Sequence, residues 1–422
     1  MSTVGIVCEY NPFHKGHQYQ INMALEKSGA DSVVCFMSGN FLQRGVPALA
    51  DKYTRAHIAL REGVAAVFEI PFVYATSSAR DYAYAAVALM NKLRCIDYIS
   101  FGAETNNLEL LKFIAHITIN EPEAVSKDIN QLVSSGLSYG RARATAICSY
   151  IKNGTFEEKD SALLHDFNVN ELDDILASPN NILAIEYLAA LEKTESSIKP
   201  VLIPRAIAHY NSTSTRNDIC SATAIREKLK KEDISFLSRH VPASCYDILK
   251  DAYKKTFPVF DDSLSQLLSG ARLMGLRTDV VDMDNDLAGR FSKLDINMSY
   301  NETALKLKCR NYTLTHIQRA LLHYIFQLTP DIYSFFKEHG TIYYARLLGM
   351  RLDKRHIVNR IKKCTDIPII TKTARANDIL DYPADIMFSF DTRAQLVYSN
   401  IVYNKYGENI PDDFRQKPNI VR

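Results

Sequence analysis

The sequence predicts an α/β fold: a Rossmann-like domain with a parallel sheet and flanking helices over residues 1–235, followed by a mainly helical, basic domain over residues 236–422. Three observations predict it. Apolar runs alternate with amphipathic stretches through the first hundred residues, which is the pattern of βαβ units. A chain of 422 residues is long for one domain. Beyond about residue 235, helical periodicity dominates.

The apolar runs predict strands, and the amphipathic stretches between them predict helices. Ser, Thr, Asp and Asn before an amphipathic stretch mark a helix start, and Gly after it marks the end. From 106 to 193 the pattern is mostly helical. The predicted strands are 3–8, 31–37, 66–70, 95–101 and 199–205, and the clearest helices are 16–27, 52–61 behind the cap Asp51, 77–92, a helix from the Ser178 cap to 193, and 222–231 behind the cap Ser221.

Composition narrows the class of protein. Hydrophobic residues make up 47% and charged residues 23% of the chain, as in ordinary globular proteins. The eight cysteines occur singly without a C-x-x-C pattern, which favours buried reduced thiols. No run of about 18 apolar residues suggests a membrane span. We therefore expect a soluble, cytoplasmic protein without membrane contact.

Basic residues concentrate near the end of the chain. Residues 301–422 carry 19 Lys and Arg against 12 Asp and Glu, a net +7, whereas residues 1–300 carry 31 against 36, a net −5. A basic stripe can bind nucleic-acid phosphates, although a solvated helix face has the same composition. The candidate RNA contacts in this stripe are Arg346, Arg351, Lys354, Arg355, Lys362 and Lys363.

The sharpest motif is His14-Lys15-Gly16-His17, between the first predicted strand and the helix after it. In an open α/β sheet the ligand crevice lies beyond the carboxyl ends of the strands, and a helix N-terminus there offers free N–H groups to phosphate. Imidazoles can donate hydrogen bonds to phosphoryl oxygens. The spacing and setting predict a phosphate-handling site with His14 and His17 as catalytic residues.

A second motif is S-x-T-x-I-R, from Ser221 to Arg226 at a predicted helix start. Its hydroxyls and guanidinium could converge on terminal phosphates. Alone it would fit an ordinary cap with a surface arginine. Lys52 and Arg55 at another helix start are further candidates for the triphosphate or for leaving pyrophosphate, with a surface helix as the alternative.

These motifs resemble those of the HxGH nucleotidyltransferases and class I tRNA synthetases, and the wider sequence resembles the bacterial tRNA(Met) cytidine acetate ligases. The resemblance is collinear over nearly the whole chain. Two positions depart from it, since Lys15 and Ala184 stand where Asn and Gly are common. The matching stretches are VGIVCEYNPFHKGH (4–17), MSGNFLQRGVP (37–47), KYTRA (52–56), FGAE (101–104), SPNNIL (178–183), SATAIR (221–226), RNYTLTHIQR (310–319) and RLLGM (346–350).

The resemblance implies a reaction. ATP would activate acetate as acetyl-adenylate, and the acetyl group would pass to the exocyclic amine of the wobble cytidine of elongator tRNA(Met), without acetyl-CoA. Mg²⁺ would come with ATP, and no metal site in the protein is implied. The implied catalytic residues are His14, His17, Lys52 and Arg226, and the implied ATP contacts are Val7, Cys8, Glu9, Tyr10, Asn11, Pro12, Phe13, His14, Lys15, Gly16, His17, Gln18, Tyr19, Gln20, Gly102, Asn180 and Arg205.

Two other functions stay open from the residues alone. One is an adenylyltransferase of a small phosphorylated metabolite, which would not need the long basic region after the second motif. The other is an RNA-binding module with an inactive site, which would not need His14, Gly16, His17 and Arg226 together. Tyr312, Tyr343 and Tyr344 could stack on an unpaired base, although packing inside a helical core would use the same residues.

Overall fold

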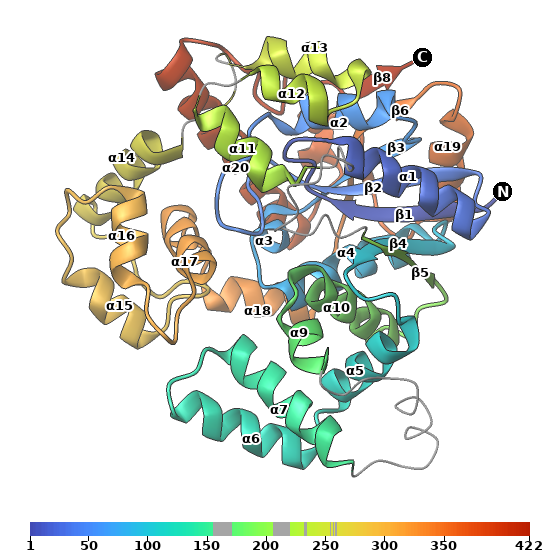
Figure 1. Cartoon of the computed structure of the whole chain (residues 1–422). Coiled ribbons are helices and arrows are strands. Elements are labelled where there is room, and N and C mark those ends of the chain that lie inside the picture. Colours follow the sequence, from blue (N-terminus) through green and yellow to red (C-terminus); the bar gives the residue numbers. More distant parts are fainter. Residues whose placement is uncertain (155–170, 206–219, 232–233, 254, 256, 258–259) are drawn as a thin grey trace.

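One sheet runs through the middle of the molecule, with helices on both of its faces (Figure 1). The computed structural model describes residues 1–154, 171–205, 220–231, 234–253, 255, 257 and 260–422. The strand order is β5-β4-β1-β2-β3-β6-β7, with β8 also paired to β6. All pairs are parallel except β3 with β6. The strands are β1 (Thr3–Cys8), β2 (Ser32–Ser38), β3 (Ala66–Ile70), β4 (Tyr98–Ala103), β5 (Lys199–Pro204), β6 (Ala345–Arg351), β7 (Ile369–Ile370) and β8 (Asn419–Val421).

The central strands are apolar along their whole length because both faces of the sheet are covered. Val4 and Ile6 of β1 pack into one core with Ile21 and Ala24 of α1 (Lys15–Ser28), on the face that α2 (Lys52–Arg61) also covers. On the other face, a Cβ at Gly5 would lie 3.0 Å from Met90 of α4 (Ala79–Leu93). Glycine at this position therefore allows α4 to approach the sheet closely.

The remaining helices surround this sheet, and the stretch α14 to α18 forms a group beside it (Figure 1). Tyr300 joins this group to the β2–α2 loop, since its hydroxyl donates to the carbonyl oxygens of Gly45 and Gln318. The helices are α3 (Phe72–Ala75), α5 (Leu108–Asn120), α6 (Glu123–Ser134), α7 (Tyr139–Asn153), α9 (Leu172–Ala177), α10 (Pro179–Lys193), α11 (Ala222–Lys230), α12 (Ser235–His240), α13 (Ala243–Ala252), α14 (Phe260–Leu273), α15 (Asn285–Ser292), α16 (Tyr300–Leu307), α17 (Leu314–Phe326), α18 (Pro330–Glu338), α19 (Arg355–Cys364), η3 (Thr373–Asp378) and α20 (Ala384–Tyr406).

The α/β fold and its parallel sheet are confirmed, and each of the five predicted strands is present. The last third of the chain, expected to be mainly helical, also contains three strands among its described residues. β6 pairs with β3, with Glu69 opposite Arg346 and Ala66 opposite Met350, and β7 and β8 extend the sheet from β6. The sheet is therefore built from both sides of the boundary expected near residue 235. Residues 155–170, within the stretch predicted to be mostly helical, lie outside the described part.

Among the described residues, no helix combines the length and apolar character that crossing a bilayer requires.

Candidate active site

The carboxyl ends of β1, β4 and β5 bring together the predicted ATP contacts. β1 lies between β2 and β4, so the connections on its two sides leave in opposite directions. Such a switch point is where open α/β sheets bind ligands. The His14–His17 motif follows β1, Gly102 lies near the end of β4, and Arg205 follows β5. The predicted position of the motif, between a strand and the helix after it, is confirmed.

His14 and His17 form a reciprocal cap at the N-terminus of α1. His14 is the N-cap residue, and its Nδ1 accepts from the backbone N–H of Gly16 at 3.1 Å. In return, Nδ1 of His17 accepts from the backbone N–H of His14 at 3.2 Å. A neutral imidazole that accepts at Nδ1 carries its proton on Nε2. Each histidine therefore keeps one Nε2–H donor for a ligand.

Both histidines are held in the neutral form. Burial, with smaller effects from the charges of Arg205, His240 and Arg226, lowers the pKa of His14 to about 4. Burial also holds the pKa of His17 well below its usual value, and the neighbouring His14 and Arg205 add to this shift. The two rings stack with centroids 3.7 Å apart. Two uncharged N–H donors thus lie side by side at the N-terminus of α1.

Arg226 brings the second motif to the first. Ser221 caps α11, since its hydroxyl accepts from the N–H of Ala224 at 3.2 Å. One turn into the helix, Nη1 of Arg226 donates to the carbonyl oxygen of Asn11 at 2.7 Å, and Nη2 donates to Thr223 Oγ1 at 3.0 Å. Both acceptors are neutral, so the positive charge of Arg226 remains available to an anionic ligand.

Arg205, Asn180 and Gly102 meet at the ends of β4 and β5. Nη1 of Arg205 donates to Asn180 Oδ1 at 3.0 Å. A Cβ at Gly102 would lie 3.2 Å from Cγ of Arg205, so a larger residue would displace the arginine side chain. The three predicted ATP contacts are therefore neighbours, and the charge of Arg205 is felt at His14.

On the side of the β2–α2 loop, the structure places the predicted ATP contact Glu9 and one further residue, Arg44, near the site. Oε1 of Glu9 accepts from the backbone N–H of Gln43 at 3.1 Å, which ties the end of β1 to this loop. Arg44 follows directly, is exposed, and lies near enough to Arg226 to lower the pKa of that guanidinium. Arg44 was missed because only its membership in the stretch 37–47 distinguishes it in the sequence.

Several other side chains of the segment 7–20 contact neighbouring parts of the protein. The side chains of Cys8, Tyr10 and Phe13 are buried in the core, and the rings of Tyr10 and Phe13 contact the ring of His17. The side chains of Tyr10 and Phe13 therefore support His17, and the buried side chains of all three residues leave only their backbone atoms for the predicted contact with ATP. Gln18 is turned toward α2, where its Nε2 donates to Glu62 Oε2 at 2.7 Å.

Lys52, predicted to be catalytic, lies in a buried cluster of charged side chains. Its side chain is 1% exposed, and its Nζ lies 2.8 Å from Glu69 Oε1 and 3.1 Å from Asp413 Oδ2. Arg346 joins the same buried cluster, with Nη2 2.7 Å from Asp413 Oδ1 and Nη1 3.3 Å from Glu69 Oε2. Two cations and two carboxylates balance each other there, so neither cation is free for phosphate.

Arg55 is also a structural residue rather than a triphosphate contact. Its Nε donates to the carbonyl oxygen of Ala50 at 2.9 Å, and its Nη1 donates to the carbonyl oxygens of Glu9 at 2.6 Å and Ser38 at 3.1 Å. Nη2 donates to the carbonyl oxygen of Gly39. Arg55 therefore fixes the segments that follow β1 and β2, on which the site depends.

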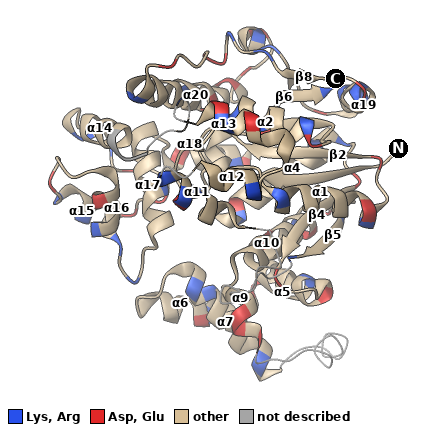
Figure 2. Cartoon of the chain, turned by 45° about the horizontal axis from the view of Figure 1, so that its top comes forward, with Lys and Arg blue, Asp and Glu red and all other residues tan. Residues whose placement is uncertain are grey.

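The basic stripe is divided in the structure. Arg346 is removed from it by burial, and Arg351 pairs with Asp353 at 2.9 Å. Nζ of Lys354 donates to the carbonyl oxygen of Asp31, just before β2, so α19 lies at the amino edge of the sheet. Figure 2 shows Lys and Arg residues on several elements, α19 among them. The exposed members of the stripe on α19 are Arg355, Lys362 and Lys363.

The tyrosines proposed as base-stacking residues are held inside the fold. Tyr344 is 1% exposed, and its hydroxyl donates to Asp391 Oδ2. Tyr312 is buried and donates to Asp284 at 2.7 Å. Tyr343 is half-buried and donates to the carbonyl oxygen of Phe336. Core packing, the alternative for all three, is the arrangement observed.

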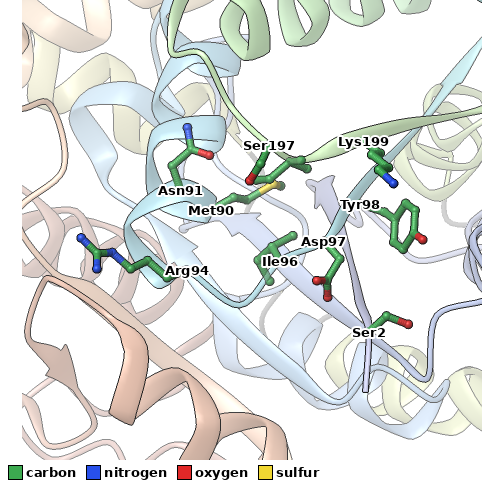
Figure 3. Close-up of a pocket in the computed structure, with 10 residues that line it drawn as sticks. Ser2, Met90, Asn91, Arg94, Ile96, Asp97, Tyr98, Ser197 and Lys199 are labelled. Atoms are coloured by element: carbon green, nitrogen blue, oxygen red, sulfur yellow. The ribbon is translucent and has the colours of Figure 1, made fainter.

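A cavity of about 390 Å³ lies away from the motif, at the amino ends of β1, β4 and β5 (Figure 3). Asp97 and Lys199 line it, and the side chain of Arg94 on its rim points away, toward the ion pair it makes with Asp366. Among the described residues, no three His, Cys, Asp or Glu side chains gather as metal ligands.

Comparison with known proteins gives the same assignment over the whole chain. A model of the HIGH nucleotidyl transferase family matches residues 1–412. The tRNA(Met) cytidine acetate ligase of Halothermothrix orenii is 36% identical over 377 residues, which cover 88% of this chain and 87% of that protein. The enzyme of the same name from Clostridium perfringens is 34% identical over 402 residues, covering 94% and 95%.

Solved structures agree. The crystal structure of Thermotoga maritima TmcAL bound with alpha-thio ATP covers all of both chains with a TM-score of 0.85 and 28% identity. The apo structure of the same protein gives a TM-score of 0.86 and 29% identity. The chain belongs to the HIGH nucleotidyl transferase family and, within it, to the tRNA(Met) cytidine acetate ligases.

Proposed function

We propose that this chain joins acetate to the exocyclic amine of the wobble cytidine of elongator tRNA(Met), with ATP as the activating co-substrate and acetyl-adenylate as the intermediate. Membership of the ligase family supports this function. The observation that carries it is the pair of neutral imidazoles at the N-terminus of α1, with Arg205 and Arg226 beside them.

In the first step, an acetate oxygen attacks the α-phosphorus of ATP, the bond from that phosphorus to the bridging oxygen breaks, and pyrophosphate leaves. The triphosphate lies at the N-terminus of α1, where N–H groups and the helix dipole favour anions. The Nε2–H groups of His14 and His17 donate to phosphoryl oxygens, and Arg205 and Arg226 balance their charge. Donors already aimed at developing charge need no reorganisation during the reaction.

In the second step, the cytidine amine bonds to the acetyl carbonyl carbon, the bond from that carbon to the phosphate oxygen breaks, AMP leaves, and the amine loses one proton to solvent. Mg²⁺ bound to the triphosphate would supply further charge neutralisation, and it commonly binds through one or two carboxylates plus phosphate oxygens. Glu9, partly buried at the end of β1, suits this role. No acetyl-CoA enters either step.

The tRNA backbone is proposed to contact the cations left exposed by the fold. Two groups of these exposed cations are candidates: Arg44 near the site, and the stripe on α19 at the amino edge of the sheet. β1 has six residues, so the two edges are separated by roughly 17 Å at about 3.3 Å per residue. A folded tRNA is long enough to reach both. Phosphate contacts at both places would position the anticodon loop over the carboxyl edge.

The experiment that tests this function is mass spectrometry of tRNA nucleosides after incubation with the purified chain. N4-acetylcytidine should form in elongator tRNA(Met) only when ATP and acetate are both present. A tRNA whose wobble cytidine is replaced by uridine is the matched control and should stay unmodified. Product formed with acetyl-CoA alone, or none with ATP and acetate, would overturn the proposal.

The adenylyltransferase alternative predicts a different product. An enzyme of that class would transfer AMP to a small phosphorylated metabolite in the absence of RNA. Incubating the chain with ATP and nicotinamide mononucleotide or phosphopantetheine, and measuring dinucleotide or dephospho-coenzyme A, separates the two. We expect neither product.

A further inference from the structure

We propose that Glu104 is a positioning residue that fixes the amide of Asn180 and, through it, the guanidinium of Arg205. The inference rests on the proposed function, in which Asn180 and Arg205 contact ATP. Glu104 directly follows β4, and both of its carboxylate oxygens are used. Oε1 accepts from Asn180 Nδ2 at 2.5 Å, and Oε2 accepts from the backbone N–H of Asn181 at 3.1 Å.

The contact between the end of β4 and the start of α10 is fixed from the other side as well. Asn181 is 1% exposed, and its Oδ1 accepts from the backbone N–H groups of Glu104 at 2.8 Å and Thr105 at 3.2 Å. Its Nδ2 donates to the carbonyl oxygen of Ile175 at 3.2 Å. Because the backbone of Glu104 is anchored in this way, its carboxylate is held at one place relative to the first turn of α10.

The orientation of the Asn180 amide follows from this. An amide has its oxygen and its NH₂ on opposite sides, so an Nδ2 directed at Glu104 turns Oδ1 the other way. Oδ1 accepts from Arg205 Nη1 at 3.0 Å, and the backbone N–H of Arg205 donates to the carbonyl oxygen of Ala103 at 2.8 Å. Glu104, Asn180 and Arg205 therefore form a chain with a defined direction of donation.

The negative charge of Glu104 is stabilised by N–H groups rather than by a cation. Among the described residues, no lysine or arginine lies within ion-pair distance of its carboxylate, whose acceptor bonds come from amide and backbone N–H groups at the start of α10. A negative charge is favourable at a helix N-terminus. Asn180 transmits the constraint to Arg205 without neutralising its guanidinium, so Arg205 is positioned and still charged toward an anionic ligand.

Two substitutions and their combination test this chain of donors and acceptors. In Glu104→Gln, the new NH₂ group either meets the donating N–H of Asn181 or faces Asn180, and in the second case the Asn180 amide must turn its own NH₂ toward Arg205. In Asn180→Asp, two carboxylates face each other. In the double variant, the amide introduced at position 104 can accept from Asn181 and donate to residue 180, whose second oxygen accepts from Arg205. The same number of hydrogen bonds is thereby restored.

The measurement is direct ATP binding by the full chain, by calorimetric titration without tRNA. Glu104→Gln should weaken ATP binding roughly tenfold, the size of one hydrogen bond to a charged or polar group. The same substitution made on the Asn180→Asp background should strengthen binding. The sign changes because the substitution removes an acceptor of the Asn180 amide in the wild type, whereas on the Asn180→Asp background it removes a repulsion between two carboxylates. Thermal midpoints of all four proteins, within a few degrees of each other, verify folding.

Glu109→Gln is the matched control, since Glu109 is a nearby exposed acid that pairs with Lys112, and it should bind ATP like the wild type. Equal ATP affinity of Glu104→Gln and wild type would overturn the role of Glu104 and leave the proposed function standing. A drop in affinity on both backgrounds would also overturn it. A wild type that does not bind ATP would overturn both.

Discussion

Two clusters of charged and ionisable side chains flank the same sheet, and they differ in what their cations contact. In the buried cluster, Lys52 and Arg346 contact Glu69 and Asp413, and all four side chains are at most 3% exposed. In the candidate site, Arg205 donates to an amide and Arg226 to a carbonyl and a hydroxyl. A cation neutralised by buried carboxylates holds the fold together, whereas one bonded to neutral acceptors keeps its charge for a ligand.

The largest expected effect is on stability and comes from the buried cluster. Lys52→Met removes one cation and leaves Glu69 and Asp413 sharing Arg346, so we expect the free energy of unfolding to fall by about 3–5 kcal/mol. Lys354→Met, at a lysine whose Nζ donates to a backbone carbonyl at the surface, should change it by less than about 0.5 kcal/mol. Urea unfolding measures both. A fully stable Lys52→Met protein without activity would make Lys52 catalytic after all.

The second prediction separates the helix-capping role of His17 from its proposed role as a hydrogen-bond donor to phosphate. Asn at this position keeps an acceptor where Nδ1 lies, so His17→Asn should preserve the helix cap and lower turnover by roughly 10² to 10³, about 2.7–4 kcal/mol for one lost transition-state donor. His17→Gln keeps a donor near Nε2 but loses the cap, at about 1 kcal/mol of stability. Steady-state kinetics with urea unfolding resolves them. Near-normal turnover of His17→Asn would exclude the phosphate role.

The combination of His14→Asn with His17→Asn sharpens this result. If both imidazoles serve one phosphoryl centre, the loss of turnover in the double variant should be smaller than the product of the two single losses. Independent, multiplicative losses would place the two donors on different groups.

The third effect is a pH dependence of stability caused by His14. Its pKa is about 4 in the folded protein and about 6.5 in the unfolded chain. Between these values the unfolded state binds a proton that the folded state does not, so stability falls as pH drops from 6.5 to 4, by up to about 3 kcal/mol. The difference in unfolding free energy between wild type and His14→Asn isolates this contribution. Burial raises the pKa of Asp391 to about 7, which gives stability the opposite dependence on pH. Because both proteins contain Asp391, taking the difference cancels its contribution. If the difference in unfolding free energy between the two proteins does not vary with pH, a carboxylate near His14 must offset the effect of burial on its pKa.

The smallest effect concerns the exposed stripe at the amino edge. Changing Lys354, Arg355, Lys362 and Lys363 to Glu should flatten the salt dependence of tRNA binding, by about 0.7–0.9 in the log–log slope for every phosphate that the protein no longer neutralises. ATP binding should be unchanged because the proposed nucleotide site lies at the other edge. An unchanged slope would identify the stripe as a solvated helix face and move the tRNA-binding surface toward Arg44.

The same contrast explains what could be predicted from the sequence. Strands β1 to β5 consist mostly of apolar residues, and the His14–His17 motif stands directly between a strand and a helix, so local pattern was sufficient to predict both. The burial and ion pairing of Lys52 and Arg346 could not be predicted because their partners are distant in the chain: Asp413 lies 361 residues from Lys52 and 67 from Arg346. Whether a charged side chain is paired inside the fold can be decided only from the tertiary structure.

The strands of the last third were missed for a related reason. β6 reads ARLLGMR, with arginines near both ends, and was interpreted as part of a basic helical stretch. β7 and β8 have two and three residues, too few for a periodicity to be detected. Their pairing to β6 depends on the sheet already formed by the N-terminal strands.

The measurement that tests the central claim most directly is exchange of radiolabelled pyrophosphate into ATP, in the absence of tRNA. Exchange requires reversible formation of an acyl-adenylate at the carboxyl edge of the sheet. We predict that wild type exchanges only when acetate is present, that His17→Asn loses the exchange by roughly 10² or more, and that the four-residue stripe variant retains it. Acetate-dependent exchange at the wild-type rate in His17→Asn would contradict the assignment of the site.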